Sequence, residues 1–156
     1  MWGFLMRAQF SAFFVLLVVT AIPVCASAPD DKIAAQQSID ALSVKASQAQ
    51  PSEQCFLYAE LVHQMTEFSL RRYAAGDVEK AAELLQQIQK LTHKIHLSVA
   101  DKDKRLKNAE ILLRRTAFRL TEMLHSSNVE DQTLVAQTLA EVNQVQNEAM
   151  MQVFRK

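Results

Sequence analysis

Two segments of this sequence place a glutamate three residues before a histidine, Glu60 with His63 and Glu122 with His125. Di-metal sites inside helical bundles are built from such Glu-x-x-His pairs on two helices, with further glutamates on the other two. The ligands of such a site must converge in the core of the bundle. Each pair would therefore have to project from the apolar face of its helix.

The positions of the neighbouring apolar residues argue against that arrangement. We set the first residue of each apolar stripe, Tyr58 and Leu106, to zero and advanced by about 100° per residue. Glu60 then falls at about 200° and His63 at about 140°, whereas the apolar residues lie within about 80°. Glu122 falls at about 160° and His125 at about 100°. Both pairs are predicted to lie on outer faces, and we expect no di-metal centre.

A second histidine pair, His93 and His96, has a spacing that lets two imidazoles on one helix share a metal. Two ligands do not complete a site, and we expect surface histidines near the C-terminal end of a helix, where the dipole favours them. A bundle that binds a small ligand or a metal through these two residues, His63 or His125 remains the alternative function. The sequence contains no glycine-rich phosphate loop, nucleophile elbow or HExxH motif. We therefore expect a protein that is not an enzyme and has no cofactor.

Composition predicts an all-α protein without a general affinity for nucleic acid. The chain has 17 basic and 17 acidic residues, which cancel, and only 2 glycines and 3 prolines. The segment 101–125 is locally basic, and Phe118 is its only aromatic residue, which is too little for a single-strand stacking platform. We expect this basic face to be complemented by acids on neighbouring helices, namely Glu79, Glu83, Glu130, Asp131 and Glu141.

The amino terminus is typical of a signal peptide. Arg7 precedes an apolar run over residues 10–22, which is short for a membrane span, and small residues around Ala26 suit cleavage after that position. A retained anchor is the alternative, whereas Val24 before Cys25 disfavours a lipoprotein. We expect an exported protein, periplasmic or secreted, that meets the membrane only through residues 1–26.

Cleavage would leave Cys55 as the only cysteine of the mature chain. The residue falls at the edge of an apolar helix face, where a small buried side chain is expected. The alternative is an intermolecular disulfide.

Apolar periodicity predicts helices throughout the mature chain. Residues 27–51 form an N-terminal helix whose seam is mostly alanine and could pack loosely, and residues 52–156 form the bundle domain. Ser52 is predicted to cap the second helix, and Gly76 and Asp77 to end it and cap the third. Helices are then expected from Val78, from Leu106 and after a Ser127–Glu130 capping box. The predicted seams step by three or four residues, except that two of them include one adjacent pair: Ala35, Ile39, Leu42, Ala46 and Ala49; Tyr58, Leu61, Val62, Met65 and Phe68; Ala81, Leu84, Leu85, Ile88, Leu91 and Ile95; Leu106, Ala109, Leu113, Ala117, Leu120 and Leu124; Val135, Leu139, Val142, Val145, Ala149 and Val153.

Residues 100–105 allow two interpretations. They contain neither glycine nor proline, so they could continue one helix of about 50 residues. A turn near Asp101–Asp103 is favoured, because a chain this short must be compact to bury a core.

The stretch Tyr73 to Ile88 resembles the hairpin of a tetratricopeptide repeat, on the strength of Gly76, Asp77 and Ala81. The resemblance covers one repeat, and no second copy occurs at the period of about 34 residues. It implies an antiparallel helix hairpin and adds weight to a peptide-binding role.

Three large apolar residues, Phe56, Leu70 and Phe118, lie off the main stripes. If these side chains are exposed, they mark a surface that binds a partner. The alternative is that they fill a second contact between helices. We therefore expect an all-α protein of antiparallel helical hairpins forming a four- to five-helix bundle after a signal peptide. The expected function is an exported interaction protein, such as an envelope adaptor, assembly factor or chaperone-like binder. Its partner is expected to be a protein, and a homo-oligomer remains open.

Overall fold

The computed structural model describes residues 29–98 and 105–155, and in these ranges it contains five helices and no strand. The helices are α1 (Pro29–Gln48), α2 (Pro51–Ala74), α3 (Val78–Ser98), α4 (Leu106–Ser126) and α5 (Val129–Phe154). The predicted all-α class is confirmed. The predicted signal segment, 1–26, lies outside the described residues.

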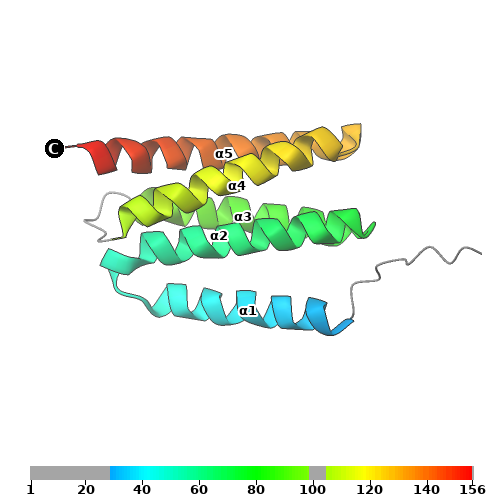
Figure 1. Ribbon diagram of the computed structural model, residues 1–156, viewed down its shortest axis with the longest axis horizontal. Helices are drawn as coiled ribbons and strands as arrows, with labels where there is room; N and C mark the ends of the chain where they lie inside the picture. Colours follow the sequence, from blue (N-terminus) through cyan, green and yellow to red (C-terminus); the bar gives the residue numbers. More distant parts are fainter. Residues whose placement is uncertain (1–28, 99–104, 156) are drawn as a thin grey trace, which may run out of the picture.

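The helices form two antiparallel hairpins, α2–α3 and α4–α5, which stack side by side (Figure 1). α2 packs against α3 and α4, and α5 packs against the same two helices. The hairpins point the same way, so α2 runs parallel to α4 and α3 runs parallel to α5 (Figure 1). α1 lies along the opposite side of α2 from α4, antiparallel to α2 (Figure 1).

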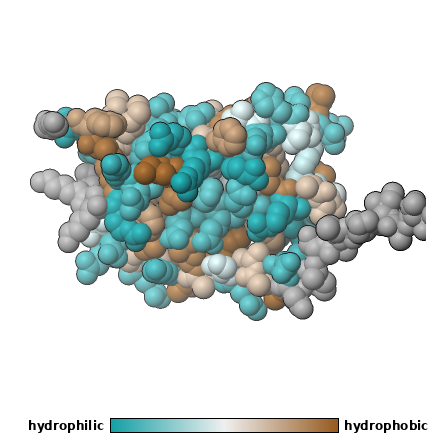
Figure 2. Space-filling model, in the orientation of Figure 1, coloured by the Kyte–Doolittle hydropathy of each residue, from teal (hydrophilic) through white to brown (hydrophobic). Residues whose placement is uncertain are grey.

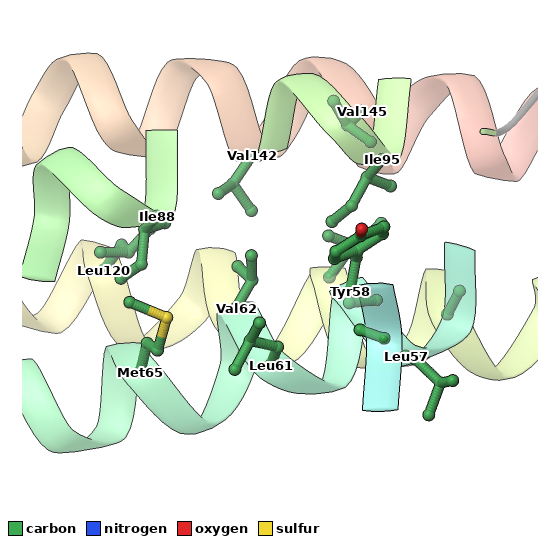
Figure 3. Packing of buried hydrophobic residues seen from close by; sticks show 14 of the residues in the cluster. Leu57, Tyr58, Leu61, Val62, Met65, Ile88, Ile95, Leu120, Val142 and Val145 are labelled. Carbon is green, nitrogen blue, oxygen red and sulfur yellow. The ribbon is translucent and has the colours of Figure 1, made fainter. Parts of the chain in front are cut away.

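α2 is the central helix of the fold because it contacts α1, α3 and α4. The predicted stripe is buried, but so are residues on the other sides of the helix, Cys55, Phe56, Leu57, Ala59, Thr66 and Ser69. Figure 3 shows Leu61 and Val62 of α2 in the same core as Ile88 of α3, Leu120 of α4 and Val142 of α5. A helix with apolar residues on all sides is expected at such a central position.

α1 is attached to the bundle through α2 alone within the described residues. Its predicted seam is confirmed, since Ile39, Leu42 and Ala46 are buried. On its outer side, Ile33 and Val44 are 57 % and 55 % exposed. The hydrogen bond from the Ser38 hydroxyl to Gln64 Oε1, 3.3 Å long, joins the two helices at an exposed position.

Because α1 buries few side chains and contacts a single helix, we expect it to open without unfolding of the bundle. Hydrogen exchange followed by mass spectrometry should show α1 amides exchanging at least about tenfold faster than those of α2. Equal protection of the two helices would show that α1 belongs to the same cooperative unit.

The ends of the helices confirm part of the prediction and correct the rest. Gly76 adopts φ +80, the left-handed conformation that glycine favours, and Asp77 Oδ1 accepts a hydrogen bond from the Lys80 backbone N–H at 3.3 Å. The predicted Ser52 cap is wrong, because Gln50 occupies the N-cap position, two residues earlier, and α2 begins at Pro51, which has no backbone N–H that needs an acceptor at a helix start.

The predicted Ser127–Glu130 capping box is also wrong. Asn128 occupies the N-cap position of α5, and Ser127 instead closes α4 by donating its hydroxyl hydrogen to the Met123 carbonyl at 2.6 Å. The buried position of Ser127 favours this local bond.

The alternative of one long helix through residues 100–105 is wrong. α3 and α4 are separate helices that pack against α2 and α5 from different sides. Residues 99–104, including Asp101 and Asp103, lie outside the described residues.

Candidate functional site

The buried polar side chains in residues 31–96 and 105–155 are all hydroxyls. Each donates a hydrogen bond to a backbone carbonyl: Thr66 to Val62, Ser69 to Ala81, Thr92 to Ile88, Thr116 to Leu112, Ser127 to Met123 and Thr138 to Leu134. These bonds satisfy the hydrogen-bond donors of the buried hydroxyl groups. Apart from Cys55 and Tyr58, the ionisable groups of the described residues lie at or near the surface, and a functional site is expected there.

The two Glu-x-x-His pairs do not converge. Glu122 and His125 are exposed on α4, and Glu122 pairs with Arg119 on the same helix. Glu60 is half-buried on α2. Within the described ranges, no three His, Cys, Asp or Glu side chains gather as they would around a metal ion.

The predicted outer-face position of His63 is wrong. The residue is half-buried, and its Nδ1 lies 3.2 Å from the Thr116 hydroxyl oxygen of α4. The angular prediction considered one apolar face, whereas α2 has neighbours on three sides. Burial lowers the pKa of His63 below its usual 6.5, Arg115 and Arg119 lower it further, and Glu67 opposes them.

This lowered pKa predicts that acid destabilises the protein through His63. The neutral imidazole is favoured in the folded state, so its contribution is present above the unfolded pKa and is lost as pH falls through the folded pKa. Urea unfolding at several pH values between about 8 and about 5 should show that His63→Gln has a flatter loss of stability than the unmodified protein. Parallel pH profiles for the two proteins would contradict the assignment.

His93 and His96 lie on the exposed side of α3, with ring centroids 6.1 Å apart. They line a groove of about 640 Å³ that also includes Glu141 and Gln144 of α5. His96 is already engaged, since its Nδ1 lies 2.6 Å from Glu148 Oε2. The structure therefore joins this pair to α5 through a histidine–carboxylate contact.

Cys55 is 0 % exposed. A thiol in this position cannot reach a second chain while α2 remains packed. The structure therefore agrees with the small buried side chain and opposes the intermolecular disulfide.

The three interaction candidates have different environments. Phe56 is only 7 % exposed, and the Arg105 guanidinium carbon lies 3.3 Å from its ring centroid. Of the two alternatives for Phe56, the structure therefore supports the contact inside the bundle and not the exposed patch. Leu70 is partly buried against the core. Phe118, in the middle of α4, is 64 % exposed.

The basic side chains of α4 are not paired with the acids predicted for them. Among the described residues, none of Glu79, Glu83, Glu130, Asp131 and Glu141 forms an ion pair with α4. Arg119 instead donates to Glu67 of α2, from Nε to Oε1 at 2.7 Å and from Nη2 to Oε2 at 3.2 Å. The prediction failed because the side of α4 that meets α2 presents Arg119, whereas its outer side points away from both neighbouring helices.

The outer face of α4 consists of Lys107, Ile111, Arg114, Arg115 and Phe118, which share one side of the helix by their spacing. The Arg114 side chain is 66 % exposed and approaches Glu110 only to 3.8 Å. Lys107 and Arg115 are exposed and have no ion pair with any described residue. Figure 2, which views the molecule with α4 in front, shows a mainly hydrophilic face with scattered apolar patches.

No known protein family matches this chain, and neither does any curated protein or solved structure. In addition, the helices described between residues 29 and 155 are too short or too polar to cross a bilayer. The function of the chain must therefore be inferred from the arrangement of its own residues.

Phe118 was predictable from the sequence as an interaction residue, but the cations beside it were not predicted as part of the same surface. The signal was present in the sequence, because Arg114 and Arg115 precede Phe118 by four and three residues and so share its helix face. What the sequence lacked was the position of the neighbouring acids. The structure shows that these cations remain open to solvent.

Proposed function

We propose that this chain is an exported helical interaction protein that binds an acidic segment of a partner protein through the outer face of α4. The observation that supports this function most directly is Phe118, a large aromatic side chain that is 64 % exposed in the middle of a helix. Aromatic and arginine side chains are enriched among the residues that dominate binding energy at protein interfaces. The outer face of α4 contains both kinds.

The geometry favours a partner that presents one apolar side chain surrounded by carboxylates. Phe118 and the half-buried Ile111 are two turns apart on α4 and offer an apolar centre. Arg114 lies between them along the helix, with Arg115 beside it and Lys107 one turn further toward the N-terminus. Burial of the ring would provide affinity, and the cations would select and orient an acidic sequence.

The charge of this face disfavours a second copy of the chain as its occupant. Two α4 outer faces in contact would bring Arg114, Arg115 and Lys107 of each copy together, and like charges across an interface are repulsive. An acidic partner protein has the complementary charge.

Export rests on the amino-terminal segment rather than on the bundle. Arg7, the apolar run over residues 10–22 and the small residues before position 27 have the order of a cleavable signal peptide. An envelope adaptor, an assembly factor and a chaperone-like binder would all use a surface of this kind.

The test is affinity capture of the tagged full-length protein from the native envelope or secreted fraction after mild crosslinking, followed by mass spectrometry. The unmodified protein should recover a partner with an acidic segment at near-equal abundance, and Phe118→Ser should lose at least about 90 % of it, as expected for a central aromatic contact. Phe154→Ser is the matched control, because Phe154 is 77 % exposed at the end of α5.

Equal recovery by both variants would contradict the α4 surface. Metal analysis of the purified protein separates the alternative function, because one bound ion per chain would favour a ligand-binding bundle that uses the histidines. Among these histidines, His93 and His96 are the best placed for such a site, because they line the groove between α3 and α5.

A further inference from the structure

A second recess lies far from the outer face of α4, where the first turns of α1 meet the last turns of α2 (Figure 1). It has a volume of about 330 Å³ and is lined by Asp31, Lys32, Phe68, Arg71 and Arg72. α1 and α2 are antiparallel, and this is why residues far apart in the sequence share the recess (Figure 1).

Positive charge dominates the lining. Among the lining residues that the structure describes, three cations face one carboxylate, Asp31, and a second carboxylate, Asp77, pairs with Arg72. Lys32 and Arg71 form no ion pair with any described residue. The N-terminal end of α1 adds the positive end of a helix dipole at the same place.

Both arginines of the recess lie over the same aromatic ring. The guanidinium carbons of Arg71 and Arg72 each lie 5.7 Å from the centroid of the Phe68 ring, within the range of a cation–π contact. This contact orients both guanidinium groups around an apolar surface. The recess thus combines cationic donors with the small part of Phe68 that remains accessible, because the residue is 4 % exposed.

Arg72 has a hydrogen-bond donor that its own surroundings do not satisfy. Its Nε is buried and has no acceptor among the described residues. Buried donors without an acceptor are uncommon in folded proteins, and each calls for an explanation. Because this nitrogen is inaccessible, a ligand in the recess would meet the exposed end of the guanidinium group and not Nε.

We infer that this recess binds a small molecule that carries one oxyanion, a phosphate or carboxylate, on a single apolar chain. Arginine and lysine donors match the oxyanion, and the Phe68 ring matches the apolar chain. The volume lies at the lower end of the range for small-ligand sites, about 300–1,000 Å³, and this favours a single-chain molecule.

Isothermal titration calorimetry of the full chain tests this site with octyl phosphate below its micelle concentration. Inorganic phosphate and octyl glucoside are matched probes that lack the chain or the charge. We expect one octyl phosphate bound per protein, inorganic phosphate weaker by at least about tenfold, and no saturable binding of octyl glucoside. Arg71→Gln and Lys32→Gln should each weaken octyl phosphate by at least about tenfold.

Lys45→Gln, a change at an exposed lysine near the other end of α1, is the control and should leave binding unchanged. Circular dichroism of each variant verifies that the bundle is folded. The inference is overturned if octyl phosphate does not bind, if the Arg71 and Lys32 variants bind it as tightly as the unmodified protein, or if octyl glucoside binds equally well. These outcomes are independent of the α4 surface, because none of the substituted residues lies on α4.

Discussion

Leu61→Ala is expected to lower the free energy of unfolding by about 2–5 kcal/mol, the range measured for large-to-small changes in a protein core. Leu61 is 1 % exposed at the centre of α2, the helix that contacts three others. The substitution removes apolar contacts and leaves a cavity that neighbours on several helices must collapse to fill. Urea unfolding followed by circular dichroism measures the loss.

Val44→Ala on α1 is the matched control, because Val44 is 55 % exposed and its truncation should change stability by less than about 0.5 kcal/mol. Similar losses for the two variants would show that α2 is not the centre of the fold. A loss below about 1 kcal/mol for Leu61→Ala would have the same meaning.

Reversing two charges on α4 is expected to give the largest effect on binding. The double substitution Arg114→Glu with Arg115→Glu turns an attractive contact with an acidic partner into a repulsive one. The affinity for the captured partner should fall by at least about a hundredfold, or about 2.7 kcal/mol, mostly through slower association at low salt. Surface plasmon resonance at two ionic strengths measures both the affinity and its salt dependence.

The control for this double substitution has the same change in net charge at other places. Lys45→Glu with Lys90→Glu alters exposed lysines of α1 and α3 and should reduce the affinity by less than about threefold, through long-range charge alone. Equal losses for the two double variants would indicate that net charge, rather than the α4 surface, determines binding.

The helices and their inner faces could be predicted from the sequence because each seam repeats at helical spacing. Ile39, Leu42 and Ala46 of α1, for instance, are buried as predicted. The burial of α2 on its other sides could not be predicted in the same way. Residues such as Leu57 and Ala59 are buried because three helices surround them, and helix neighbours are a property of the fold rather than of one segment.

The candidate site was predictable only in part for the same reason. Phe56 and Phe118 both lie off the main stripes, yet one is buried and the other exposed, since their burial depends on which helix lies beside them. The acids expected to cover α4 were chosen by charge alone, whereas Glu67, the acid that binds Arg119, lies on α2 opposite it. The spacing of His63 predicts an outer face because a single helix does not show that α1 and α4 lie beside that residue.

The sequence contains a signal for the recess between α1 and α2. Arg71 and Arg72 end one helix, and Lys32 begins the helix before it. In an antiparallel pair these positions meet, so three cations at one end of a hairpin could have been expected. The position of both arginines over the Phe68 ring required the structure.

The most direct test of the central proposal is a photo-reactive phenylalanine analogue at position 118, irradiated in the cells that make the protein. We predict an adduct with one protein, mapped by mass spectrometry to an acidic segment, and no such adduct when the analogue replaces the exposed Lys90 of α3. An adduct with lipid or nucleic acid at position 118, the same adducts from both positions, or no adduct from either would contradict the proposed role of α4.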